Sequence, residues 1–438
     1  MAPISNESGG NLLSTPGNEK PQKFERQQVQ YEDLTTDFND KLIDFSKQFC
    51  HIYSVRLAEL RAVLIPQVNA KWGKIQILKL AELEDFEGQE CVIIGTLYKH
   101  QKCKPSILHE LSEDHQLTLP EPRSNYCSEK DQLFLEDEML RIRLVVEDAD
   151  LKNYITGVVC AILGHKEKDG SFMIKEWCFP GCVPKSSLAQ PKSKGKLLFL
   201  SGLDLANNSK SLSLSLLTEW ICGNSVKTVT KTNTLMGHAE GKAKDAAIAK
   251  EVAVATTLLD AFLAEIATCC CITLMPGQHD PVNAMLPQRP LHPCILPLTS
   301  RFKSFKGATN PWLGKVAERI IMGTSGQPIE DIVKATGAID ISPLDWLERT
   351  LLWRHMCPTA PDTLPVHPYS VKDPFIINYC PDIYFVGNTD KVETKLWKGE
   401  ENQVVRLICI PKFSSTNLAV MVDIETLDID IINFGTST

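Results

Sequence analysis

The sequence carries no surplus of positive charge. Its 438 residues include 46 Lys and Arg against 54 Asp and Glu, which gives a formal net charge of −8. A protein whose main task is to grip phosphate backbones usually has a basic surplus, because neutralising phosphates releases counterions and drives binding. The composition therefore disfavours direct nucleic-acid binding as the main role, although it leaves room for local basic patches.

The sequence also lacks a long uninterrupted apolar run, and we expect no cleavable targeting signal. Its first 21 residues are rich in Ser, Asn, Gly and Pro, which predicts a disordered tail over residues 1–30. The longest apolar stretch, residues 253–275, contains Asp260 and Glu265, so we do not expect it to span a membrane.

Paired cysteines of the zinc-binding kind are also missing. The 15 Cys are an odd number and lie mostly inside apolar runs, which suits buried thiols in a reducing compartment such as the nucleus or cytosol. Cys178 and Cys182 come closest to a metal-binding pair, but no second pair accompanies them. We therefore expect no zinc site and no cofactor.

Residues 31–80 are predicted to be an N-terminal helical segment. Apolar residues recur there at spacings of three and four, at Leu34, Phe38, Leu42, Phe45 and Phe49. This spacing is typical of a helix, and Pro66 is expected to end it. We expect the helix to pack on its own domain, and docking onto a partner is the alternative.

Residues 85–183 have the pattern of several short strands. These are predicted over residues 90–100, 140–146, 154–164 and 172–179. In the second of them Arg141 and Arg143 alternate with apolar residues, which indicates that one face is buried. So many strands in a short span favour a small barrel, with a long polar loop over residues 101–131.

Residues 195–434 follow a Pro-, Ser- and Lys-rich linker and alternate strands with helices. Strands are predicted over residues 196–200, 218–222, 269–275, 383–386, 404–410 and 418–424, and an amphipathic helix over residues 244–268. This order indicates an α/β domain, whose sites lie at the carboxyl edge of the sheet. The chain thus combines an α/β domain with an all-β domain.

Four predicted strand ends carry glycine beside small or polar residues. They are Gly202-Leu-Asp204, Gly223-Asn224, Gly277-Gln-His-Asp280 and Gly387-Asn-Thr-Asp390. The series resembles the loops of calcineurin-like metallophosphoesterases, in which Asp, Asn and His side chains hold two metal ions that activate water against phosphorus. The resemblance implies a phosphoesterase-like sandwich for residues 195–434.

Most metal-binding residues of that family are missing at the corresponding positions. These positions hold Gly202, Asp204, Asn224, Gln278, His279, Asp280, Met322, Asn388 and Asp390. Only His279 and Asp280 keep the expected residue type, and Gly202 has no side chain at all. A pair of divalent cations needs anionic and imidazole donors, so we expect neither metal nor catalysis here. We expect Asp204, His279 and Asp280 to form loop hydrogen bonds.

Irregular Pro- and Gly-rich strings carry a second resemblance. They include LMPGQHDP at residues 274–281, LPQRPLHPC at 286–294, GTSG at 323–326 and PTAPDTL at 358–364. Such strings rarely match by chance. They resemble the B subunits of eukaryotic replicative DNA polymerases, most closely the delta type. The resemblance covers about residues 40–434 and implies an OB-fold joined to an inactive phosphoesterase-like domain.

The resemblance also implies a role. It implies a non-catalytic scaffold subunit of the nuclear DNA polymerase delta complex, acting in replication and repair synthesis. The expected partners are the C-terminal cysteine-rich domain of the catalytic subunit and a third, clamp-binding subunit. DNA would be reached indirectly through this complex, and no membrane is involved.

Two alternatives stay open at this point. One is a divergent metal-dependent phosphodiesterase or exonuclease that uses Asp204, His279, Asp280 and Asp390. The other is a single-strand-binding OB-fold, because such folds can bind single strands through a basic groove with stacking aromatic residues. The candidate nucleic-acid contacts are Arg141, Arg143, Lys166 and Trp177.

Overall fold

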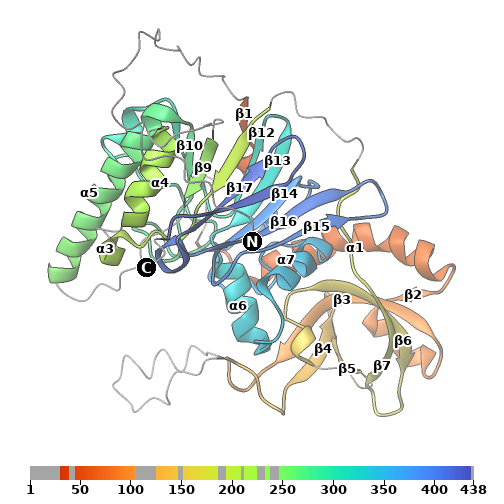
Figure 1. Cartoon of the computed structure of the whole chain (residues 1–438). Coiled ribbons are helices and arrows are strands. Elements are labelled where there is room, and N and C mark those ends of the chain that lie inside the picture. The colour runs from red at the N-terminus through yellow and green to blue at the C-terminus, as the bar shows by residue number, and fades with distance from the viewer. Residues whose placement is uncertain are drawn as a thin grey trace, which may run out of the picture.

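The computed structural model describes residues 30–38, 45–104, 125–146, 151–185, 194–208, 212–223, 232–236 and 246–435. Within these ranges the strands form three six-stranded sheets. One sheet closes into a barrel, and the other two stack as a sandwich with helices on both outer sides (Figure 1).

The barrel contains the strand-rich region of the sequence. Its strands are β2 (Ile77–Leu78), β3 (Cys91–His100), β4 (Gln132–Glu136), β5 (Arg141–Val145), β6 (Val159–Lys166) and β7 (Phe172–Cys178). They follow the order β2-β3-β4-β5-β7-β6, and β3 also pairs with β6, which closes the barrel. The four strands predicted here are confirmed, whereas β4 and β2 were missed, and β2 lies in the segment predicted to be helical. Short 3-10 helices η2 (Leu80–Phe86) and η3 (Leu151–Asn153) lie between strands.

The prediction of one helix from residue 31 that ends at Pro66 is wrong. Residues Tyr31–Asp33 form strand β1 and Thr35–Phe38 form the 3-10 helix η1, while helix α1 spans Cys50–Trp72 with Pro66 inside it. A proline costs a helix one hydrogen bond, but apolar residues on both sides of Pro66 are buried, and α1 lies against β3 and β6 of the barrel. The packing of α1 on the barrel therefore outweighs the cost of the proline to the helix. Leu42 lies outside the described residues.

Two stacked sheets make up the sandwich. The first has the order β1, β12 (Trp312–Val316), β13 (Arg319–Thr324), β14 (Ile383–Thr389), β16 (Val404–Pro411) and β15 (Glu393–Lys398). The second has the order β11 (Phe305–Gly307), β10 (Ile272–Leu274), β9 (Thr232–Met236), β8 (Lys196–Phe199), β17 (Leu418–Asp423) and β18 (Ile429–Asn433). Buried side chains of both inner faces, such as Phe199, Phe385 and Ile408, form one apolar core.

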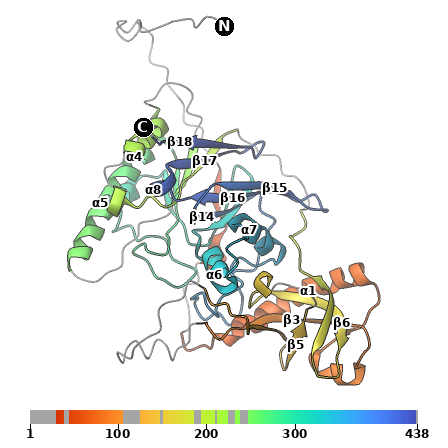
Figure 2. The same ribbon diagram turned by 60° about the horizontal axis from the view of Figure 1, so that its bottom comes forward.

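Helices cover the outer face of each sheet (Figure 2). Helices α6 (Gln327–Thr336) and α7 (Pro343–Leu352) lie on the first sheet. Helices α3 (Leu205–Asn208), α4 (Leu212–Cys222) and α5 (Ala246–Cys269) lie on the second, near α8 (Phe413–Thr416) and the 3-10 helix η4 (Thr299–Arg301). The chain therefore builds a helix–sheet–sheet–helix arrangement beside the barrel.

The strand predicted over residues 218–222 is wrong, because this segment belongs to helix α4. Ser213, Leu217 and Ile221 are buried at a spacing of four residues, which is the period of a helix that packs on a sheet. A short apolar run cannot be assigned by composition alone. The other five strands predicted for this domain are confirmed by β8, β10, β14, β16 and β17.

Helix α5 confirms the predicted amphipathic helix. It is long and apolar enough to cross a membrane by length and composition alone. Its contacts, however, are those of a core helix, because Leu263, Ile266 and Ala267 are fully buried against the second sheet. Its buried Asp260 accepts hydrogen bonds from the backbone N–H groups of Leu298 and Thr299, both at 2.8 Å.

Candidate functional site

Two of the loops that carry predicted site residues contact each other where β8 and β14 end. The Ser201 hydroxyl accepts a hydrogen bond from the backbone N–H of Asn388 at 2.8 Å and donates to the Asn388 amide oxygen at 3.1 Å. The Asn388 amide nitrogen donates to the Ser325 carbonyl oxygen at 2.7 Å. The neutral amide of Asn388 thus joins three strand ends. In the phosphoesterase family that the sequence resembles, these strand ends carry metal ligands.

Gly202 is held in a position that only glycine suits well. Its φ is +59°, in the left-handed region. A Cβ atom there would lie 2.9 Å from both the Asn388 amide oxygen and Lys412 Cβ. The neighbouring side chains therefore occupy the space into which a carboxylate at position 202 would have to grow.

A cleft of about 650 Å³ opens at this edge of the sandwich. The predicted residues Gln278, His279, Asn388 and Asp390 line it. Its remaining lining includes Ser325, Gln327, Glu330, Val333, Lys334, Ile339, Ile341 and Lys412. Helix α6 and the turn after it supply much of the apolar side, so the cleft is part apolar and carries charges of both signs.

The other predicted residues do not line this cleft. The Asp280 carboxylate is turned into its own loop, where it accepts a hydrogen bond from the Gly277 backbone N–H at 2.7 Å. Met322 is a buried residue of β13, with 2% of its surface exposed, so placing it at the later histidine position is wrong. The strand end that reaches the cleft is Ser325 to Gln327. Asn224 lies outside the described residues.

The donor set does not fit a metal pair. In the described part of the chain, no three His, Cys, Asp or Glu side chains are grouped closely enough to hold a metal ion. Lys412 lines the cleft as well, and it adds positive charge where two divalent cations would need negative donors. No metal-dependent step follows from this arrangement.

A buried network of neutral side chains lies behind the cleft, and sequence reasoning missed it. The Asn310 amide nitrogen lies 2.7 Å from Gln288 Oε1, 2.8 Å from Ser325 Oγ and 2.9 Å from Gln327 Oε1. Gln288 in turn donates to the Gly277 carbonyl oxygen at 3.0 Å. Gln288 and Asn310 are 1% and 0% exposed. The Pro- and Gly-rich strings were the available signal, since Gln288 and Ser325 lie within them.

The barrel and the sandwich are joined through a buried arginine on α1. Arg56 donates from Nε to Asp373 Oδ2 at 2.7 Å and from Nη2 to the Ala360 carbonyl oxygen at 2.8 Å. Its Nη1 reaches a barrel carbonyl, that of Gly157 at 3.1 Å, and a sandwich carbonyl, that of Pro358 at 2.9 Å. One guanidinium therefore satisfies groups from both domains.

His355 contacts the Arg56–Asp373 ion pair and is itself neutral. Burial and the Arg56 charge lower the pKa of His355 to about 4. Its Nε2 lies 2.9 Å from Asp373 Oδ2, and its Nδ1 accepts from the Cys357 backbone N–H at 3.2 Å, so Nε2 carries the proton. Although burial opposes ionisation, Arg56 and His355 hold the pKa of Asp373 well below its usual range.

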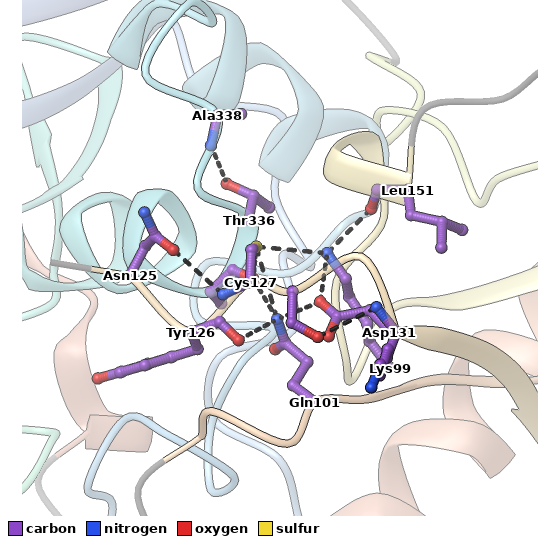
Figure 3. Close-up of polar contacts among 12 residues, drawn as sticks. Lys99, Gln101, Asn125, Tyr126, Cys127, Asp131, Leu151, Thr336 and Ala338 are labelled. Atoms are coloured by element: carbon purple, nitrogen blue, oxygen red, sulfur yellow. Dashed lines mark hydrogen bonds and ion pairs between the residues drawn. The ribbon is translucent and has the colours of Figure 1, made fainter. Parts of the chain in front are cut away.

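A second contact pins the barrel to the end of helix α6 (Figure 3). The Gln101 amide donates to the Ala335 carbonyl oxygen at 2.9 Å and to Asp131 Oδ2 at 3.1 Å. The Cys127 thiol donates to the same Ala335 oxygen at 3.4 Å, and burial raises the pKa of this thiol. The Lys99 ammonium donates to the Leu151 carbonyl oxygen at 3.0 Å. The last carbonyls of α6 are thus capped by the barrel.

The structure separates the four predicted nucleic-acid contacts. Trp177 stacks against Tyr154 at 4.8 Å and lies 6.1 Å from the parallel ring of Phe179, which contacts the sandwich residue Trp353 at 6.4 Å. Trp177 therefore belongs to the aromatic packing between barrel and sandwich. Lys166 lies at the end of β6, opposite Phe172 of β7 in the strand register. Of the four residues, only Arg141 and Arg143 share one exposed strand face.

Both halves of the chain match known families. Residues 48–177 match the DNA polymerase delta subunit OB-fold domain, and residues 197–395 match the B-subunit family of DNA polymerases alpha and epsilon. These matches define the class, the B subunits of DNA polymerases.

Full-length relatives narrow the class. DNA polymerase delta subunit 2 of Drosophila melanogaster is 38% identical over 429 residues, covering 94% of this chain and 98% of that protein. The DNA polymerase delta small subunit of Oryza sativa is 35% identical, covering 94% and 99%, and that of Saccharomyces cerevisiae is 29% identical, covering 89% and 90%. The chain belongs to the family of DNA polymerase delta small subunits.

Proposed function

We propose that this chain is a non-catalytic scaffold subunit of the DNA polymerase delta complex in the nucleus, used in replication and repair synthesis. It would hold the C-terminal cysteine-rich domain of the catalytic subunit and a third, clamp-binding subunit together. The family membership supports the place in the complex. The observation that carries the scaffold role is at the edge of the sandwich. There the neutral amide of Asn388 bonds to Ser201 and Ser325, at a position where a phosphoesterase would hold metal.

The sandwich, on this proposal, is a calcineurin-like phosphoesterase fold that has lost its chemistry. Two stacked sheets with helices on both outer faces support it, as do the loops after β10 and β14 that line one cleft. Asp280 bonds to its own loop, and Asn388 bonds to Ser201 and Ser325. The loops have kept their turns and serve to hold the strand ends in place.

A scaffold must also keep its own domains in a fixed relation. Linking two partners raises the effective concentration of one near the other only if the geometry allows both to be engaged. The buried Arg56 contacts and the capped end of α6 supply that rigidity, because both cross from barrel to sandwich. Each partner would then meet a surface of defined orientation.

The test is assembly of the complex from purified proteins. The full chain is co-expressed with the catalytic subunit and the third subunit, and the mixture is separated by size at moderate salt. We expect all three to elute together, and the catalytic and third subunits to separate when this chain is left out. If the two partners stay together without it, or if neither elutes with it, the scaffold role is wrong.

A further inference from the structure

The outer face of the barrel carries aromatic and arginine side chains in register on neighbouring strands. Tyr98 on β3 is the direct partner of Phe134 on β4, and Phe134 is the direct partner of Arg143 on β5. Side chains paired in this way project from the same face of a sheet. The three therefore form one row across the strands, outside the barrel, whose inside is filled by their buried neighbours such as Leu135 and Ile142.

Arg141 extends this row from the next position along β5. Its guanidinium carbon lies 4.0 Å from the centroid of the Tyr98 ring and 5.7 Å from that of Phe134. The two rings are 6.4 Å apart and tilted by 48°. A planar cation is thus already held over an aromatic surface. We call Tyr98, Phe134, Arg141 and Arg143 the aromatic–arginine face.

Among the described residues, three carboxylates of the neighbouring loops are bound to groups outside this face. Asp137 accepts from the backbone N–H groups of Met139 and Leu140, and Glu138 pairs with Arg61 of α1 at 2.6 Å. Asp169 accepts from the Ser171 hydroxyl at 2.6 Å. The exception is Glu136, which pairs with Arg141 itself. Among the described residues, Glu136 is therefore the carboxylate that an anionic ligand would have to displace from Arg141.

We propose that the aromatic–arginine face binds single-stranded DNA. Aromatic rings offer stacking surfaces that any unpaired base can use, and arginines beside them reach the phosphates. A duplex hides its base faces, so the rings would add nothing to its binding. The strands involved, β4 and β5, follow β3 in the barrel, and OB-folds bind oligonucleotides on the face of their second and third strands.

The affinity of the isolated chain is expected to be low. The net charge of −8 and the Glu136 pairing both oppose binding of a polyanion, so the dissociation constant should be on the order of 10–100 µM at physiological salt. Such a site becomes useful when the polymerase already holds the DNA nearby, since tethering raises the local concentration to about the millimolar range. That use rests on the proposed function, whereas the binding itself does not.

The experiment measures fluorescence anisotropy of a labelled 20-nucleotide oligo-dT with the full chain at low and moderate salt. The key variant is Arg141→Glu, and its matched control is Lys175→Glu. Both residues lie exposed on the barrel and pair with a glutamate, Lys175 with Glu90 at 2.6 Å. Both substitutions also change the net charge equally. We expect Arg141→Glu to weaken binding about tenfold and the control less than twofold.

Salt dependence and stacking give two further readouts. Losing one phosphate contact should reduce the slope of log affinity against log salt by about 0.7 in Arg141→Glu. Phe134→Leu keeps the charge and should still weaken binding several-fold, with the melting temperature measured to confirm that it folds. An unlabelled duplex of the same length should compete poorly.

Four results would overturn the proposal. They are no binding by the parent chain even at low salt, equal loss in the Arg141 and Lys175 variants, full affinity in Phe134→Leu, and equal competition by the duplex. Arg141→Glu is also tested for assembly with the polymerase subunits. If it abolishes assembly, the face is a subunit interface instead. A failure of DNA binding with normal assembly leaves the scaffold role intact.

Discussion

The joint between barrel and sandwich and the cleft edge of the sandwich use buried polar groups in opposite ways. At the joint the groups are charged, and Arg56 and Asp373 are fully buried with no exposed side-chain surface. Behind the cleft edge the buried network is neutral, and Gln288 and Asn310 bond one another and nearby loops. The joint between the domains therefore relies on a buried charge, whereas the network behind the cleft relies on neutral side chains.

This difference has an energetic meaning. A buried ion pair adds little net stability compared with apolar packing, but removing one partner is costly because it leaves the other charge unpaired. A neutral amide network can lose a member at a smaller cost. The joint should therefore be the sensitive region and the cleft the tolerant one.

The largest effect is expected from Asp373→Ala. It leaves Arg56 buried without its carboxylate and should lower the free energy of unfolding by about 3–5 kcal/mol, measured by urea denaturation. The matched control is Glu90→Ala, which breaks the exposed pair with Lys175 and should leave stability unchanged within error. A loss for Asp373→Ala no larger than for the control would remove the distinction between joint and surface.

Acidification should weaken the same joint. The folded pKa of His355 is lowered to about 4, below its ordinary value of 6.5, so the unfolded chain takes up this proton first as the pH falls. The contribution of neutral His355 is complete above pH 6.5 and is lost between about pH 6.5 and 4, by roughly 3 kcal/mol. Melting temperatures over this range should fall more steeply for the parent chain than for His355→Asn. Parallel curves would show that His355 does not carry the effect.

A loss of stability of intermediate size is expected from Gly202→Ala at the cleft edge. Its matched control is Gly170→Ala, because both glycines have positive φ but a Cβ at Gly170 would meet nothing within 4 Å. We expect a loss of about 1 kcal/mol for Gly170→Ala from backbone strain alone, and about 2–3 kcal/mol for Gly202→Ala. Thermal unfolding gives both values. Equal losses would mean that Asn388 and Lys412 yield without cost.

The smallest effect is expected from His279→Ala. His279 lines the cleft, but the described residues offer no metal-binding group around it. The parent chain and the variant should both fail to hydrolyse a chromogenic phosphodiester with added Mn²⁺, and their melting temperatures should differ by only a few degrees. Metal-dependent turnover in the parent that disappears in His279→Ala would restore the phosphodiesterase alternative.

Local patterns predicted much of this fold. Alternation along residues 140–146 placed Arg141 and Arg143 on an outer face, and the apolar runs that became β8, β10 and β14 placed Gln278 and Asn388 at strand ends beside one cleft. Helix α4 was missed because a short apolar run has no period of its own until the sheet it covers is known. Met322 was misplaced because spacing along the chain could not show that β13 continues to Thr324 before the cleft begins.

The joint could be predicted only in part. Arg56 interrupts a buried stripe on α1 made of Ile52, Leu60, Leu64 and Val68, and a charge in such a stripe indicates a buried partner. The sequence does not identify that partner. Asp373 is 317 residues away from Arg56 and comes close to it only when the domains fold.

That separation also has a consequence for synthesis. The barrel leaves the ribosome first, with Arg56 already on its helix but with only the Gly157 carbonyl available to it. At ordinary elongation rates the segment with Asp373 follows roughly 15–60 s later, because 317 residues lie between them. During that interval the arginine stays in water, and the two domains cannot close on each other. Docking of the barrel is therefore a late event, completed only once almost the whole chain has been made.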